Sequence, residues 1–159
     1  NKQAGILFIP VHHDGNTQAS EEEIDEIKKL TDELLGRTLT TIDGNDRKVT
    51  WNDILFVAPY NYQCRKLKDA LGEQAKVGSV DKFQGQEAPI VFLSMCTSDA
   101  SESPRGLDFL LNKNRINVAI SRAQTLAIVV GNPSLGNTKV NHVNQLKLVN
   151  LFNALCSND

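Results

Sequence analysis

Continuous apolar runs alternate with amphipathic stretches along this chain. Four such runs, and one shorter mixed segment at 76–80, predict strands; the four runs are residues 5–11, 54–58, 90–96 and 126–130. Strands that are apolar on both sides are typical of a parallel sheet covered by helices on both faces. The pattern therefore predicts one α/β domain, with a mostly parallel sheet, over residues 1–159.

Helical periodicity fills the gaps between these runs. Ser20 fits an N-cap, and Glu23, three residues on, completes a capping box ahead of an apolar stripe that Gly36 ends. Further helices are predicted over about 61–71, 107–122 and 143–155, and a loop over 97–106. Asp43 and Gly44 together predict a turn or hairpin.

Composition adds little except where charge gathers. The chain has 159 residues and a net charge of −2, but the segment 19–35 holds seven acids against two lysines, a net of −5. A solvated helix face is the favoured interpretation of that segment. Three cysteines without a CxxC pair argue against a zinc site or a disulfide framework and predict a cytoplasmic protein. No run of about 18 apolar residues predicts a membrane span. The missing initiator Met suggests a fragment of a longer chain.

Several common catalytic motifs are absent from the 159 residues. There is no GxxxxGK[ST] phosphate loop, no strand ending in an acidic pair for Mg²⁺, and no GxSxG or HExxH. His12 and His13 are adjacent, so on a strand they would point to opposite faces, and a strand-end turn is favoured over a metal site. Trp51 is interpreted as a core or rim anchor rather than a base-stacking platform.

Two polar segments beside apolar runs carry the candidate chemistry. In the first, residues 84–87 (Gln-Gly-Gln-Glu) join a strand end to the next strand. Gly85 permits a left-handed turn or a close approach to a ligand, and Glu87 can accept hydrogen bonds from sugar hydroxyls or a basic partner. A tight turn with solvated polar side chains is the alternative.

In the second segment, Arg115 and Arg122 are two helical turns apart and share one face. Ile116 and Ala119 can pack beneath them. Two guanidinium groups on an anchored helix form a rigid fork for phosphate or carboxylate. A pair of surface salt bridges explains the spacing equally well.

Taken together, these segments resemble the second RecA-like domain of superfamily 1 helicases, in the branch of the nonsense-mediated decay helicase. Residues 54–63 look like motif IV, 80–87 like motif V and 114–123 like motif VI. Gly131-Asn132-Pro133 resembles the strand-end sequence that follows. The wider pattern is closest to bacterial proteins that fuse a RecB-like nuclease to such a helicase. The resemblance implies a RecA-like fold of the P-loop NTPase type that itself lacks the P-loop.

The resemblance also assigns roles at the nucleotide. ATP would lie between two RecA-like domains, and the first of these would supply the phosphate loop and the Mg²⁺ ligands. By position in motif VI, Arg122 would be the arginine finger, supported by Arg115. In motif V, Glu87 would contact the ribose or orient the finger, and Gln84 and Gly85 would couple the nucleotide site to the strand.

A single strand is the second implied partner, with DNA favoured over RNA by the nuclease-fusion resemblance. Five residues from motifs IV and V would lie toward the strand or the interdomain cleft; they are Pro59, Tyr60, Gln63, Ser79 and Lys82. The isolated domain is expected neither to hydrolyse ATP appreciably nor to unwind a duplex. Its further expected partners are the first RecA-like domain and a fused nuclease domain.

Two other functions remain open. A non-catalytic module that binds nucleic acid or protein could keep this fold without being a motor, although such a binder does not need the arginine pair of motif VI. A doubly wound small-molecule enzyme would need a glycine-rich cofactor turn after the first strand. Residues 11–16 do not supply GxGxxG, which disfavours that function.

Overall fold

The computed structural model describes residues 5–16, 19–40, 44–83, 85–96 and 113–133. The predicted loop at 97–106, the predicted closing helix at 143–155 and the side chain of Gln84 lie outside these residues. The observed strands are β1 (Gly5–Pro10), β2 (Thr38–Thr40), β3 (Asp46–Lys48), β4 (Ile54–Val57), β5 (Lys76–Gly78), β6 (Ala88–Ser94) and β7 (Ala123–Gly131). The helices are α1 (Glu21–Leu34), α2 (Asn61–Leu71) and α4 (Lys113–Ser121), with short 3₁₀ turns η1 (Trp51–Asp53) and η2 (Asp81–Phe83).

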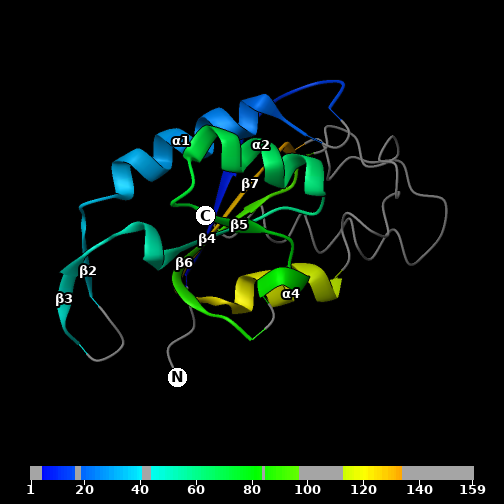
Figure 1. Cartoon of the computed structure of the whole chain (residues 1–159). Helices are drawn as coiled ribbons and strands as arrows, with labels where there is room; N and C mark the ends of the chain where they lie inside the picture. The colour runs from blue at the N-terminus through cyan, green and yellow to red at the C-terminus, as the bar shows by residue number, and fades with distance from the viewer. Residues whose placement is uncertain (1–4, 17–18, 41–43, 84, 97–112, 134–159) are drawn as a thin grey trace.

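Five strands form one sheet in the order β1-β7-β6-β4-β5, and every neighbouring pair is parallel. Helices α1 and α2 cover one face of this sheet and α4 lies against the other (Figure 1). Parallel strands need crossovers that carry helices over the faces, which explains this three-layer arrangement. The predicted α/β fold class with helices on both faces is confirmed.

The core divides into two clusters, one on each face of the sheet. Successive residues of β4 alternate between them: Leu55 and Val57 pack on the α4 side, and Ile54 and Phe56 on the side of α1 and α2. On that second side the rings of Phe56 and Phe92 stack with centroids 5.3 Å apart and planes 9° apart. Burial on both faces is the reason why these strands are apolar throughout rather than alternating.

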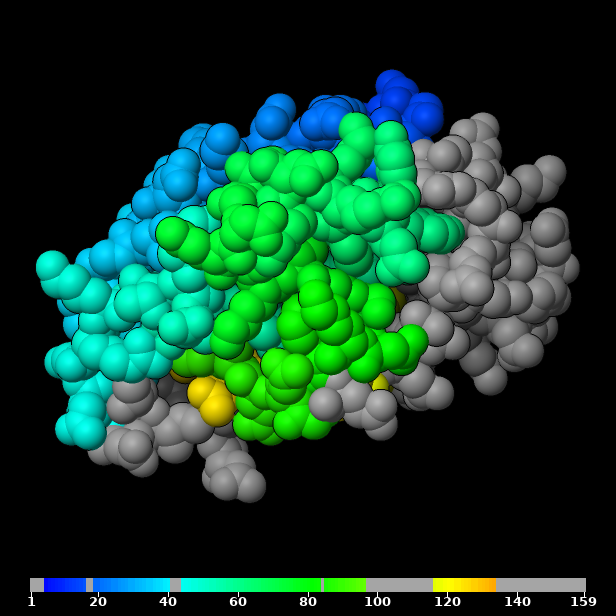
Figure 2. Space-filling model, viewed as in Figure 1, coloured from blue at the N-terminus to red at the C-terminus, as the bar shows by residue number. Residues whose placement is uncertain are grey.

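A small antiparallel hairpin, β2 paired with β3, extends from one end of the fold (Figure 1). Gly44 has a φ of 82°, the left-handed conformation that glycine adopts most readily in such turns. The hairpin predicted from Asp43 and Gly44 is therefore confirmed for the strands that flank it. In the space-filling view the hairpin lies at the left edge, while α1 and α2 form a continuous surface above the sheet (Figure 2).

An ion pair fastens the hairpin to the domain. The Arg47 guanidinium donates to both carboxylate oxygens of Asp53, and the backbone N–H of Thr50 donates to Asp53 at 2.8 Å. The hydrogen bonds from Arg47 hold the pKa of Asp53 below its ordinary value; burial opposes this effect and the bonds from Thr50 add to it. Asp53 thus serves both the ion pair and the turn of η1.

This lowered pKa predicts a pH-dependent contribution to stability. Because the unfolded carboxyl titrates near its ordinary value of about 3.9, the contribution is complete above that pH and is lost as the pH falls through the lower pKa of the folded state. We expect Asp53→Asn to reduce the free energy of unfolding of the chain at pH 7. The deficit relative to wild type should shrink below about pH 4, as measured by urea denaturation at several pH values. Asp46→Asn, on the exposed hairpin, is the control, and a deficit independent of pH would contradict the assignment.

The N-terminus of α1 follows the prediction only in part. Ser20 does cap the helix, since its hydroxyl accepts from the backbone N–H of Glu23 at 3.2 Å. The capping box also predicts that the backbone N–H of Ser20 donates to the side chain of Glu23. That prediction is wrong, because this N–H donates to the side chain of Gln63 at 2.9 Å instead. Glu23 is fully buried and turns into the domain, so it is also an exception to the predicted solvated acidic face.

Candidate functional site

Glu87 and Arg122 lie side by side although 35 positions separate them in the sequence. Each directly precedes a strand, β6 and β7 respectively, and Ala88 pairs with Ala123 in the sheet register. The backbone N–H of Ala88 donates to the carbonyl of Arg122 at 2.9 Å. Glu87 is exposed, and the amide of Gln124 reaches its carboxylate at 3.5 Å. The structure therefore brings the two principal residues of motifs V and VI to one edge of the sheet.

The side chain of Arg122 combines partial exposure with an unsatisfied donor. Its backbone N–H donates to the carbonyls of Val118 and Ala119, which ends α4 just before the strand begins. Its Nε atom is buried and has no hydrogen-bond partner among the described residues. Buried donors are nearly always paired, so an orphan one points to a missing acceptor. A phosphate or carboxylate oxygen would fit a guanidinium in this position.

The remaining residues predicted for the nucleotide are only partly described. The backbone of Arg115 is helical in α4, so it lies on the same helix that leads into Arg122. Its side chain and all of Gln84 lie outside the described residues. Gly85 is exposed and has a φ of 80°, so the predicted left-handed turn is confirmed there. A side chain at Gly85 would meet open space but would strain the backbone.

The motif IV residues lie at the opposite edge, where β4 ends. Pro59 is half-buried. Tyr60 is only 7% exposed and packs into the core cluster on the α4 side. Gln63 is fully buried, and its amide bonds to Ser20 and Ser94. Tyr60 and Gln63 therefore shape this edge from inside, and their predicted place toward a single strand or the interdomain cleft stays a prediction.

The residues predicted around the start of motif V follow the end of β5. Ser79 is half-buried, and its carbonyl accepts from the backbone N–H of Lys82. Lys82 is exposed overall, but its amine donates to the carbonyl of Val77 at 2.8 Å and its stem packs against Gly78. A side chain at Gly78 would clash with that stem. Lys82 is thus held against the strand end with its ammonium group close to this edge.

Sequence reasoning missed an aromatic and basic cluster on α2 beside motif IV. Tyr62 is 45% exposed, unusual for a large side chain in the described part of this protein. The guanidinium carbon of Arg65 lies 5.8 Å and the ammonium of Lys66 lies 5.3 Å from its ring centroid. Lys66 also pairs with Glu21 of α1. A tyrosine with cations three and four residues later on a helix was the available signal, and such a cluster suits single-strand binding.

The candidate residues thus occupy two opposite edges of one sheet. Glu87 and Arg122 lie at the amino ends of β6 and β7, whereas Pro59, Tyr62 and Ser79 lie near the carboxyl ends of β4 and β5. The expectation that ligands collect at carboxyl ends fits the second group and does not fit the first. Strand β6 spans seven residues, which corresponds to about 20 Å between the two edges.

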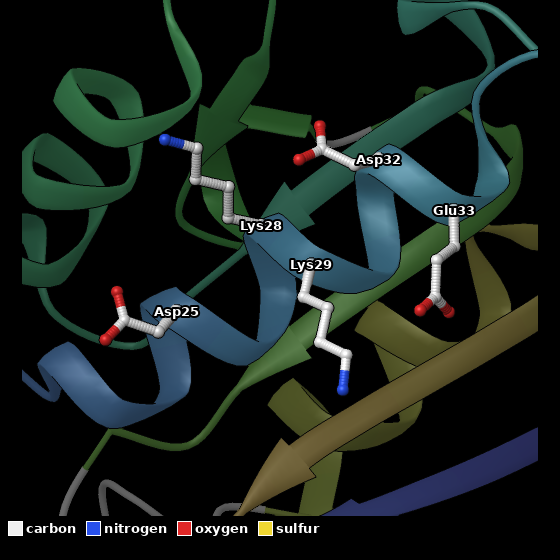
Figure 3. A pocket seen from close by; sticks show the side chains of 5 residues that line it. All are labelled: Asp25, Lys28, Lys29, Asp32 and Glu33. Carbon is white, nitrogen blue, oxygen red and sulfur yellow. The ribbon is translucent and has the colours of Figure 1, made fainter.

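A shallow concave surface on the outer side of α1 is not a convincing site. Its lining consists of Asp25, Lys28, Lys29, Asp32 and Glu33, all from that one helix. Figure 3 shows their side chains fanning out in different directions rather than converging on a point. Three acidic and two basic side chains mix along it, which fits the solvated face predicted for this segment.

Among the described residues, no group of three or more His, Cys, Asp or Glu side chains could hold a metal ion. No helix in the part of the chain that the structure describes is long and apolar enough to cross a membrane.

Comparisons with known proteins show which family the sequence resembles. The sequence matches a protein family described as "AAA domain" over residues 8–134. It is 35% identical over 128 residues to "Putative helicase mov-10-B.1" of Danio rerio, covering 71% of this chain and 13% of that protein. It is 42% identical over 107 residues to "RNA helicase Mov10l1" of Mus musculus, covering 63% and 8%. It is 38% identical over 82 residues to "DNA polymerase alpha-associated DNA helicase A" of Schizosaccharomyces pombe, covering 50% and 12%. The chain thus spans only about an eighth of the length of these relatives, or less.

Proposed function

Because the chain belongs to the AAA domain family, matched over residues 8–134, we propose that it is the second motor domain of an ATP-dependent superfamily 1 helicase. The family match, the relatives named helicases and the parallel sheet together support a helicase-type domain with a RecA-like fold. The observation that carries the proposal is that Glu87 and Arg122 directly precede the paired residues Ala88 and Ala123, and that the buried Nε of Arg122 lacks an acceptor among the described residues.

At the nucleotide, the chain would contribute groups from the amino edge of the sheet. Arg122 would offer guanidinium N–H groups to the negative charge that develops on the transferring phosphoryl group. Glu87, exposed and next to it, would contact the ribose or orient the arginine, and Arg115 would approach from the same helix. Mg²⁺, with ligands from a first RecA-like domain, would supply further charge neutralisation. What this chain itself does is bind and orient from one side of the cleft.

At the nucleic acid, the carboxyl edge would carry the contacts. Tyr62 offers an exposed ring on which a base can stack, and Arg65 and Lys82 offer positive charge for phosphates. Pro59 and Ser79 lie at the same edge and would contact the backbone of the strand. Contacts to the sugar–phosphate backbone do not distinguish one base sequence from another. The relatives include proteins named as RNA helicases and as DNA helicases, so either RNA or DNA is a candidate. A fused nuclease domain stays a prediction.

The absence of a phosphate loop from the 159 residues predicts a sharp difference between this chain and its longer parent. We expect the parent protein to hydrolyse ATP at a rate that single-stranded RNA or DNA increases. The isolated chain should release phosphate from ATP no faster than buffer alone. Half of a two-sided ATP site binds nucleotide weakly and lacks the phosphate-binding loop. Phosphate release, measured with and without each strand, checks both expectations.

Two results would contradict the proposal. Stoichiometric ATPase activity in the isolated chain, lost on Arg122→Ala, would show that one domain suffices. A parent protein that binds single strands but never hydrolyses ATP would support the non-catalytic binding module instead. Circular dichroism of the isolated chain provides the control that it is folded when assayed.

A further inference from the structure

A buried polar network lies between α1, α2 and the carboxyl end of the sheet, on none of the surfaces discussed above. Its side chains are almost inaccessible: Ser20, Glu23, Gln63 and Ser94 are 0% exposed, Asn132 is 3% and His13 is 6%. Buried polar groups are costly unless they are paired, so a cluster of this size in a domain core calls for an explanation.

Glu23 is the acceptor at the centre of the network. One carboxylate oxygen accepts from the hydroxyl of Ser94 at 2.8 Å and from the backbone N–H of Cys96 at 3.0 Å. The other lies 2.6 Å from Nε2 of His13. Cys96 has a φ of 57°, a left-handed conformation that is strained for a residue with a side chain. Glu23 thus fixes the way in which the chain leaves β6.

Gln63 joins α2 to the same network. Its side-chain oxygen accepts from the backbone N–H of Ser20 at 2.9 Å, and its amide nitrogen donates to the hydroxyl of Ser94 at 3.1 Å. Ser94 therefore accepts from Gln63 and donates to Glu23. Its single hydroxyl is the junction between the helix that begins at the motif IV edge and the rest of the network.

The network holds the ends of the two β-strands that follow Glu87 and Arg122, the residues proposed to contact the nucleotide. Strand β6 begins next to Glu87 and ends at Ser94. Strand β7 begins next to Arg122, and just after its end the side chain of Asn132 donates to the carbonyl of His13 at 2.5 Å. Both strands that start at the nucleotide edge therefore finish in hydrogen bonds that lead to Glu23.

We propose that Ser94 and Glu23 are positioning residues. They would couple nucleic-acid binding at the carboxyl ends of the β-strands to nucleotide binding at the amino ends of β6 and β7. Single-stranded nucleic acid bound near Pro59 and Tyr62 would shift the position of α2. Gln63 would transmit this shift through Ser94 to β6. Close-packed interiors have low compressibility and transmit strain, so a shift at the carboxyl end of β6 would reach Glu87 at its amino end. This inference rests on the proposed function.

The test measures the affinity of the full-length parent protein for single-stranded nucleic acid, with and without nucleotide. The dissociation constant of a fluorescent single strand is measured by anisotropy, alone and with a non-hydrolysable ATP analogue, and the ratio of the two constants is the coupling factor. We expect Ser94→Ala and Glu23→Gln each to reduce a wild-type coupling factor of about fivefold or more to roughly one. The affinity without nucleotide should change little. The double variant should lose no more than either single variant, because both break one path.

Glu22→Gln is the matched control, since it makes the same chemical change one residue away on the exposed face of α1. A coupling factor that Ser94→Ala and Glu23→Gln leave at the wild-type value overturns the inference, as does a wild-type factor of one. A parallel loss of folded protein and of all binding in both variants also overturns it, because the network would then be only structural. ATPase activity in the wild type separates these outcomes from failure of the proposed function.

Discussion

Replacing Arg122 by alanine in the full-length parent protein is expected to lower its strand-stimulated ATPase rate by about three orders of magnitude. Arginine fingers contribute about 10³–10⁵ to the rate of phosphoryl transfer because they meet charge that exists only in the transition state. For the same reason the affinity for ATP should change far less than the rate. Initial rates of phosphate release at saturating ATP and saturating single strand measure this effect.

Arg122→Lys sharpens the experiment. Lysine keeps the positive charge but loses the planar fork of donors, including the equivalent of the buried Nε. We expect most of the loss to persist in this variant. Arg37→Ala is the control, because Arg37 is an exposed arginine between α1 and β2 that belongs to neither group of proposed binding residues. A rate that Arg122→Ala leaves unchanged would mean that the finger is assigned to the wrong residue.

Replacing Phe92 by alanine is expected to destabilise the chain by about 3–5 kcal/mol. Phe92 lies on the central strand β6, is fully buried, and stacks against Phe56 with ring centroids 5.3 Å apart. Removing the ring loses apolar burial and leaves a cavity that two packed helices cannot readily close. Domains of this size are stable by only about 5–15 kcal/mol, so the variant should be substantially unfolded at modest denaturant concentrations.

Urea denaturation followed by circular dichroism measures this loss. Leu7→Ala is the matched control, since Leu7 is a large apolar side chain on β1 that is already 36% exposed. Its replacement should cost less than about 1 kcal/mol. Equal losses in the two variants would contradict the assignment of Phe92 to the core.

The hydrogen-bond partners of Gln63 and Glu23 could not be predicted from local sequence patterns. Both stand in patterns with well-known local meanings, a motif beside a strand end and a capping box at the start of a helix. The structure gives both residues long-range partners, 31 positions away for Gln63 and Ser94 and 71 positions away for Ser94 and Glu23. Local spacing is blind to such bonds because they depend on how separate helices pack on the sheet.

The sequence by itself determined the fold class, most element positions and the neighbourhood of the candidate chemistry. It could do so because burial on both faces makes a parallel strand apolar throughout, and because amphipathic periodicity and glycine turns are local properties of the chain. Only the tertiary structure decided which polar residues meet. It placed Glu87 beside Arg122 through the pairing of β6 with β7, turned Gln63 inward and left Tyr62 exposed. Strand order and helix packing bring together residues far apart in sequence, and the physical contacts that fix them are not written in any one segment.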